Sequence, residues 1–132
     1  MKTNEELLKL AQDASKNAYS IYSRFSVGAC ALYSSGNCYI GCNVENASYG
    51  LSLCAERNAI STAIAAGETG HLVKIAIYSP NSKNCLPCGA CRQWFCEFEK
   101  GQEIEIILQD DNGCCSYKIN DLMPYVFKLN VV

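Results

Sequence analysis

The sequence predicts an α/β protein with three layers, α/β/α, in which helices flank a five-stranded mixed sheet. Helix-like and strand-like patterns alternate in the middle of the chain, an order typical of a sheet covered by helices. The last two predicted strands are too close in sequence for a parallel crossover, so we expect them to form an antiparallel hairpin. The chain has 132 residues, a typical length for one domain, and we expect residues 1–132 to fold as a single domain.

Three long helices are predicted from apolar residues that recur on one face, and a short helix follows at the end of the chain. The first begins at a capping box made by Thr3 and Glu6. The second ends where Gly67 can adopt the left-handed conformation. Asp121 is expected to cap the short last helix, with Pro124 near its start. The three long helices are expected over 4–18, 53–66 and 88–98.

Five strands are predicted from short apolar runs and from the turns between them. Ser-Ser-Gly-Asn separates the first two strands and Asp-Asp-Asn-Gly the last two, and both segments are typical of hairpin turns. The third run is almost continuously apolar, as expected of a buried strand. The predicted strands are 26–33, 38–43, 73–79, 103–109 and 114–119.

Charge and hydropathy exclude several classes of protein. Eleven basic and thirteen acidic residues give a formal net charge of −2, and no run of Lys or Arg offers a track for phosphates. A nucleic acid polymer is therefore not an expected partner. No stretch reaches the roughly 18 apolar residues that a membrane span requires. The charged N-terminus has the pattern of neither a signal peptide nor a transit peptide, so we expect a cytoplasmic protein with no membrane partner.

Cysteine is unusually frequent, with ten in 132 residues. Without a secretory signal a disulfide scaffold is not favoured, and metal binding or catalysis is the more typical use of thiols. Most of the cysteines are expected to pack as small hydrophobic side chains: Cys30, Cys38, Cys42, Cys96, Cys114 and Cys115. The four others lie where predicted helices begin: Cys54, Cys85, Cys88 and Cys91.

Two short segments, Cys54-Ala55-Glu56 and Pro87-Cys88-Gly89-Ala90-Cys91, carry the chemistry. Cys88 and Cys91 are three residues apart at a helix start, so both sulfurs point to one side. Two helix N-termini that face each other favour thiolates, and three thiolates would bind Zn²⁺ with a fourth position open. An open position is the catalytic pattern, in which zinc-bound hydroxide is the nucleophile and Glu56 moves protons. Arg57 either donates hydrogen bonds to the sulfurs, offsetting their charge, or is a surface cation.

These two cysteine segments resemble those of a known family. The zinc deaminases carry a Cys/His-x-Glu segment followed by Pro-Cys-x-x-Cys. This chain has the three-cysteine form, and nearly its whole length is similar to the small homotetrameric zinc-dependent cytidine deaminases of the cytidine/deoxycytidylate deaminase superfamily. The segments that carry the resemblance are 22–29, 41–49, 54–57 and 87–93.

The resemblance implies an activity and a metal site. The activity is hydrolytic deamination of free cytidine and deoxycytidine to uridine and deoxyuridine plus ammonia, in pyrimidine salvage. One Zn²⁺ per subunit would be held by Cys54, Cys88 and Cys91, and zinc-bound hydroxide would attack C4 of the ring. Glu56 matches the proton shuttle, and Arg57 matches the arginine that compensates the thiolate charge.

The resemblance also implies residues that bind the nucleoside. Asn43 and Glu45 match those that hydrogen-bond the ribose hydroxyls, and Phe25 matches an aromatic side chain of the base pocket. Ala47 and Tyr49 match a segment that builds the pocket at a subunit boundary. Phe127 matches an aromatic side chain that reaches the base from a neighbouring subunit, although the preceding Leu-Met-Pro departs from the family's double leucine. A homotetramer with shared active sites is therefore expected.

Other interpretations of these residues remain open. Phe25 and Tyr49 could pack in the core, and Asn43 and Glu45 could close the loop before the second helix. Cys85 could join a structural four-cysteine zinc site or an iron–sulfur cluster. The pair formed by Cys88 and Cys91 could act as a redox pair of the thioredoxin type. The single histidine, His71, is expected to be exposed in a loop.

Within the deaminase interpretation there are two rival substrates. A cytosine-nucleoside antibiotic of the blasticidin type is disfavoured by Glu45, because a carboxylate suits ribose hydroxyls. Polymeric DNA or RNA is disfavoured by the absence of a basic surface, and by the closing hairpin, which resembles that of nucleoside-acting members.

Overall fold

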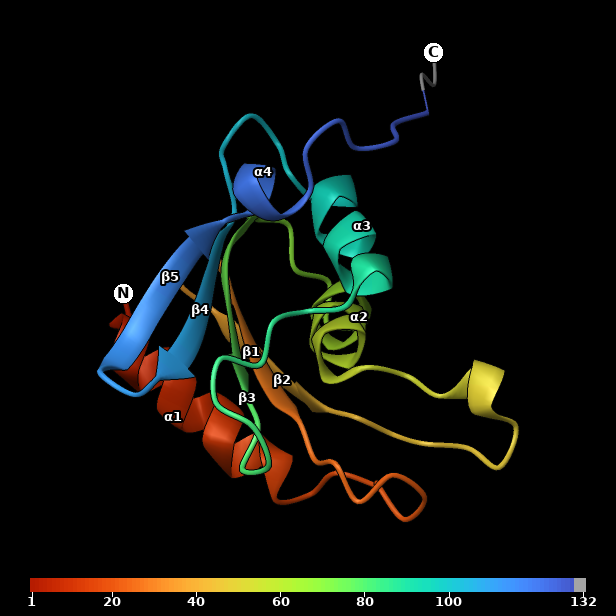
Figure 1. Ribbon diagram of the computed structural model, residues 1–132. Helices are drawn as coiled ribbons and strands as arrows, with labels where there is room; N and C mark the ends of the chain where they lie inside the picture. Colours follow the sequence, from red (N-terminus) through yellow and green to blue (C-terminus); the bar gives the residue numbers. More distant parts are fainter. Residues whose placement is uncertain (130–132) are drawn as a thin grey trace.

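The computed structural model describes residues 1–129 and contains one five-stranded sheet between two layers of helices (Figure 1). The strand order is β2-β1-β3-β4-β5, and only β3 and β4 pair in parallel, so the sheet is mixed as predicted. The elements are α1 (Asn4–Ser15), β1 (Gly28–Tyr33), β2 (Cys38–Cys42), η1 (Tyr49–Leu51), α2 (Ala55–Ala65), β3 (Leu72–Tyr78), α3 (Gly89–Glu97), β4 (Glu105–Asp110), β5 (Gly113–Lys118) and α4 (Ile119–Leu122). The expected single domain over 1–132 includes residues 130–132, which lie outside the described range.

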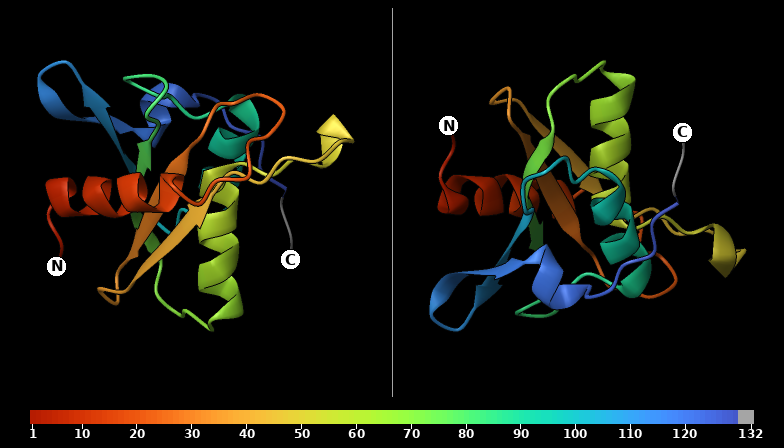
Figure 2. Two further views of the ribbon diagram at one scale, coloured as in Figure 1. Left: turned by 90° about the horizontal axis from the view of Figure 1, so that it is seen from below. Right: turned by 90° about the horizontal axis from the view of Figure 1, so that it is seen from above.

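Both faces of the sheet are covered by apolar layers, and the strand alternation divides the core accordingly. In β1, Ala29, Ala31 and Tyr33 face the layer of α2 and α3, whereas Cys30 and Leu32 face α1. All six residues of β1 are buried, as expected of a central strand covered on both sides. Figure 2 shows α1 crossing one face of the sheet while α2 and α3 lie together on the other.

The register of the sheet brings two helix starts to the same place. Gly28 at the beginning of β1 pairs with Cys42, the end of β2, on one side and with Tyr78, the end of β3, on the other. The chain leaves β2 toward α2 and leaves β3 toward α3. The N-termini of both helices therefore lie at one end of the sheet, on the same face.

Two glycines let helices approach the sheet closely. A Cβ atom at Gly28 would lie 1.9 Å from the carbonyl oxygen of Ala11 in α1. At Gly41 it would lie 2.4 Å from the backbone nitrogen of Ala59 and 2.6 Å from the carbonyl oxygen of Ala55, both in α2. Only glycine fits at these positions, because the obstructing atoms are helix backbone.

The structure confirms the predicted helix signals at two ends and corrects them at two others. Thr3 and Glu6 form the capping box, and Gly67 has φ of +81°. The first helix ends at Ser15, not at residue 18. The backbone N–H of Tyr19 donates instead to the carbonyl of Asn43, at 2.9 Å, which draws the chain out of the helix.

The end of the chain also differs from the expectation. The last helix, α4, begins directly after β5 and has Lys118 at its N-cap position, so Asp121 lies within the helix and does not cap it. Pro124 lies beyond the helix, because a proline disfavours helical backbone in the residue before it, here Met123. His71 is half-buried rather than exposed, and its Nε2 lies 3.0 Å from Oε1 of Gln102. Within residues 1–129 no helix is long and apolar enough to cross a membrane.

The close approach at Gly41 predicts a selective loss of stability. Gly41→Ala would push α2 away from β2, and we expect the free energy of unfolding to fall by about 1–3 kcal/mol, as for other overpacked sites. Gly50→Ala is the matched control, because nothing lies within 4 Å of a Cβ atom there. Urea denaturation of the two variants measures the difference, and equal stability would contradict the packing described for α2.

Candidate active site

Three cysteine sulfurs converge where α2 and α3 begin. Cys54 is the N-cap residue of α2, Cys88 is the N-cap residue of α3, and Cys91 lies in the first turn of α3. Their sulfur atoms all lie within 4.8 Å of one another. Cys91 is buried, Cys54 is half-buried and Cys88 is exposed, so the cluster can be reached from solvent. The convergence predicted from the two segments is confirmed.

The surroundings of the cluster favour negatively charged sulfur. The pKa of Cys54 is lowered to about 5, because the Cys91 thiol donates a hydrogen bond to it and the Arg57 guanidinium adds a second. Nη2 of Arg57 lies 3.2 Å from the Cys54 sulfur. The pKa of Cys91 is raised, since it holds the shared proton and is buried. Arg57 is thus partly buried against the cluster and is not a free surface cation.

The donor set fits zinc. Three thiolates and one open position are a common zinc arrangement, and Zn–S bonds of about 2.3 Å place sulfurs about 3.8 Å apart in a tetrahedron. Nε of Arg57 is buried and has no hydrogen-bond partner among the described residues, so the contact of Nη2 with the Cys54 sulfur is the one that directs this cation at the cluster. Cys85 does not belong to the cluster, and burial raises the pKa of its thiol to about 11. The geometry therefore favours a three-cysteine site over a four-cysteine site.

A buried carboxylate stands beside this cluster. Glu56 lies in the first turn of α2 and is only 4% exposed, and burial raises its pKa to about 7. Burial of a carboxylate with no cationic partner in contact is costly, and a pKa raised in this way is characteristic of functional sites. Neither a redox pair nor a purely structural zinc site would require this carboxylate.

A pocket of about 250 Å³ opens over the cluster and contains Glu56. Asn43 and Glu45 line this pocket together with Cys54 and Cys88. Four residues of the lining were not predicted from the sequence: Val27, Ser52, Leu53 and Leu86. Val27 lies in one of the segments that carry the resemblance, so that segment could have indicated it. The complete lining is Val27, Asn43, Glu45, Ser52, Leu53, Cys54, Ala55, Glu56, Cys85, Leu86 and Cys88.

Asn43 joins the pocket to the preceding loop. Its side-chain oxygen accepts from the backbone N–H of Val27 at 2.9 Å, and its amide nitrogen donates to the carbonyl of Phe25 at 2.8 Å. One amide N–H remains available for a ligand. Asn43 therefore closes the loop before β1, not the loop before the second helix that the sequence left as an alternative, and it keeps one amide N–H for a ligand.

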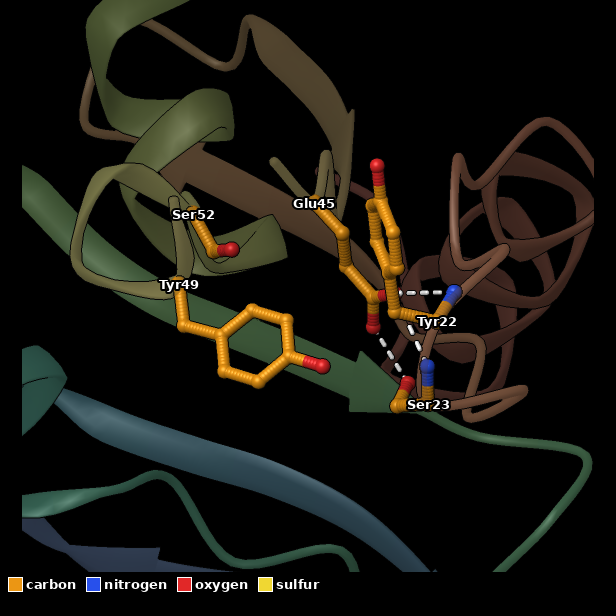
Figure 3. Close-up of a pocket in the computed structure, with 5 residues that line it drawn as sticks. All are labelled: Tyr22, Ser23, Glu45, Tyr49 and Ser52. Carbon is orange, nitrogen blue, oxygen red and sulfur yellow. Dashed lines mark hydrogen bonds between the residues drawn. The ribbon is translucent and has the colours of Figure 1, made fainter. Parts of the chain in front are cut away.

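Glu45 lies between this pocket and a second one of about 280 Å³ that is lined by Tyr22, Ser23, Glu45, Tyr49 and Ser52 (Figure 3). Its carboxylate accepts hydrogen bonds from the backbone N–H groups of Tyr22 and Ser23, each at 3.0 Å, and from the Ser23 hydroxyl. The rings of Tyr22 and Tyr49 meet edge to face, with centroids 5.9 Å apart.

Four predicted substrate residues do not reach the pocket over the cysteines within one chain. Phe25 is 37% exposed, Tyr49 lines only the second pocket, and Ala47 is exposed on the segment that carries η1. The ring of Phe127 is 70% exposed, although its carbonyl accepts from Nε2 of Gln93 at 2.9 Å. Neither Phe25 nor Tyr49 packs in the core, so the core-packing alternative is not confirmed.

Fold and site together define the class of protein. Three cysteines at two helix starts, with a glutamate that is not part of the cluster, are the arrangement of the zinc-dependent deaminases. Comparison with known proteins agrees. A family model described as the cytidine and deoxycytidylate deaminase zinc-binding region matches residues 1–104.

Individual relatives extend the similarity over most of the chain. The cytidine deaminase of Mycobacterium tuberculosis is 41% identical over 120 residues, which cover 91% of this chain and 86% of that protein. A probable cytidine deaminase of Dictyostelium discoideum is 34% identical over 123 residues, covering 93% and 82% of the two chains. The crystal structure of a cytidine deaminase from Burkholderia pseudomallei matches with a TM-score of 0.87 at 40% identity, over 96% of this chain and 100% of that chain. This chain belongs to the zinc-binding cytidine and deoxycytidylate deaminase family.

Proposed function

We propose that this protein hydrolyses free cytidine and deoxycytidine to uridine and deoxyuridine, releasing ammonia, as a cytoplasmic enzyme of pyrimidine salvage. One observation carries the proposal: the buried carboxylate of Glu56 lies in the pocket that also presents the cysteine cluster, Asn43 and Glu45. A zinc-binding module would need no such pocket. The names of the relatives, which are cytidine deaminases, support the same activity.

The metal would be held by Cys54, Cys88 and Cys91, with one zinc per subunit. When bound, zinc supplies Lewis acidity, which makes water a nucleophile at neutral pH. Three thiolates would give the centre a net negative charge and weaken that effect. Arg57, within hydrogen-bond distance of Cys54, offsets this charge.

Glu56 carries out the proton transfers. Its carboxylate accepts a proton from the attacking water and delivers it to N3 as the bond to C4 forms. Glu56 then takes the proton of the new C4 hydroxyl and delivers it to the amino group. The amino group leaves as ammonia while the C4 carbonyl forms. Water and the nucleoside are thereby converted to the uracil nucleoside and ammonia. Burial keeps Glu56 out of bulk water, so its protons go to the substrate.

The pocket favours a neutral nucleoside. Asn43 offers a donor and Glu45 an acceptor, the pair that sugar hydroxyls require. None of the described residues that line the pocket is Lys or Arg, so no cationic side chain there would pair with the phosphate of a nucleotide. Polymeric nucleic acid is disfavoured for the same reason. The acceptor at Glu45 suits the hydroxyls of ribose or deoxyribose, so cytidine and deoxycytidine are favoured over a cytosine-nucleoside antibiotic of the blasticidin type.

Glu56→Gln tests the proposed mechanism. The variant is nearly isosteric but cannot transfer protons, so we expect kcat to fall by about 10²–10⁴-fold with zinc content and thermal stability retained. Ammonia release is measured with cytosine, cytidine, deoxycytidine, CMP and blasticidin S. The wild type is expected to act on the two nucleosides. Wild-type-like turnover by Glu56→Gln would disprove the role of Glu56, and preferential use of CMP or blasticidin S would disprove the proposed substrate.

We also propose that the protein is a homotetramer with active sites shared between subunits. Tyr49 and Leu51 are 74% and 67% exposed on the segment that projects from the body of the molecule in Figure 1. Tyr125 and Phe127 are likewise exposed, on the extended C-terminal segment. Large exposed side chains such as these favour contact with another chain, since apolar surface is stabilised when it is covered. Ala47 and Tyr49 would line a neighbour's pocket boundary, Phe25 would border the base, and Phe127 would stack on the base from another subunit.

Mixing inactive subunits tests the shared site. Phe127→Ala subunits retain Glu56, and Glu56→Gln subunits retain Phe127, so co-refolded mixtures should regain about a quarter of wild-type turnover if a closed homo-oligomer forms at random. Mixtures of Glu56→Gln with Cys54→Ala are the control and should stay inactive: Glu56 and Cys54 belong to the same pocket of one chain, so every pocket in the mixture carries one of the two changes. Absence of recovery in the first mixture, or a fully active monomer in sedimentation, would contradict the shared site.

A further inference from the structure

The carboxylate of Glu45 is held by the loop that precedes β1. Its Oε1 accepts two backbone N–H groups, those of Tyr22 and Ser23, each at 3.0 Å, and its Oε2 accepts the Ser23 hydroxyl. These three groups are called here the Glu45 donor set, and all three are visible in Figure 3. They lie more than twenty positions from Glu45 in sequence, so tertiary structure brings them together.

The direction of the Ser23 hydroxyl is fixed by a second contact. The backbone N–H of Phe25 donates to Oγ of Ser23 at 3.0 Å, so Oγ acts as the acceptor in that bond. The single hydroxyl proton of Ser23 is then free to point only toward Glu45. These hydrogen bonds lower the pKa of Glu45, the largest contribution coming from the Ser23 hydroxyl, so the carboxylate is a full acceptor at neutral pH.

Counting acceptor positions limits what Glu45 can bind. An ionised carboxylate has about four lone-pair positions in its plane, two on each oxygen. The two N–H groups fill those of Oε1, and the Ser23 hydroxyl fills one on Oε2. One position remains for a ligand, and Glu45 lies where the two pockets meet, because it lines both of them.

We propose that Ser23 is a positioning residue that fixes Glu45 with a single free acceptor position, so that Glu45 binds one sugar hydroxyl and does not detect the other. This inference rests on the proposed function, because it concerns the sugar of the same nucleoside. It assigns a role to Ser23, which does not contact the ligand, and it gives a physical reason why ribose and deoxyribose nucleosides can share the site.

The experiment compares three substrates: cytidine, 2′-deoxycytidine and 3′-deoxycytidine. The variants are Ser23→Ala, Ser23→Thr and Glu45→Gln. Ser20→Ala is the matched control, since the Ser20 hydroxyl lies in the same loop but pairs with that of Ser26 at 2.9 Å. Zinc content and melting temperature are recorded for each variant. Values of kcat and KM are measured separately.

For the wild type we expect one deoxynucleoside to match cytidine within about threefold in kcat/KM and the other to lose tenfold or more, the order expected for one hydrogen bond to a charged group. Ser23→Ala should lower kcat/KM for cytidine about tenfold, mainly through KM, and should have no effect on the deoxynucleoside that lacks the Glu45-bound hydroxyl. Ser23→Thr retains the hydroxyl and should restore activity, and Ser20→Ala should resemble the wild type.

Two results would overturn the inference. If Glu45→Gln lowered kcat/KM equally for both deoxynucleosides relative to the wild type, Glu45 would detect both hydroxyls, because a residue that binds one hydroxyl affects only the deoxynucleoside that retains it. An equal loss for all three substrates in Ser23→Ala would show a general structural role instead of positioning. If the wild type acted on none of the three nucleosides, the proposed function itself would fail, and this outcome is distinct from the other two because it needs no variant.

Discussion

The meeting of two helix N-termini at one end of the sheet is the constraint on which the site depends. It follows from the register around Gly28, which places the ends of β2 and β3 on either side of the start of β1. Cys54 and Cys88 are then both N-cap residues, at the positive ends of their helices. Cys91, in the first turn of α3, completes the cluster. Gly41 permits the contact, because α2 lies against the backbone of β2.

This arrangement brings negatively charged groups together at a partly buried site, and a nearby positive charge is needed to offset them. Three cysteine sulfurs, of which Cys54 has a lowered pKa, lie beside the buried carboxylate of Glu56. Among the described residues, Arg57 is the only cationic side chain within hydrogen-bond distance of the cluster. A divalent cation would neutralise more of this charge than Arg57 alone, so the free energy of metal binding also stabilises the fold. Catalysis would use the same groups. The three sulfurs would hold the cation that activates water, and Glu56 would move the protons of that water.

The sequence predicted the elements whose signals are local. The capping box at Thr3, the hairpin turns and the two cysteine segments each lie within a few residues, and all were found. The sequence-based prediction failed where distant parts of the chain decide the structure. The first helix ends early, at Ser15, where Tyr19 pairs with Asn43, and β5 continues directly into α4. The link between Ser23 and Glu45 left no local signal. The role proposed for Phe127 would require a neighbouring subunit, whose surface the sequence of one chain does not describe.

Zinc content, measured together with ammonia release from cytidine, tests the central claim most directly. The wild type and four single variants, Cys54→Ala, Cys88→Ala, Cys91→Ala and Cys85→Ala, form the set. Our account predicts one zinc per chain in the wild type and in Cys85→Ala, both active, and loss of both zinc and activity in the other three. Loss of zinc from Cys85→Ala, or full activity in a wild-type chain without zinc, would contradict it.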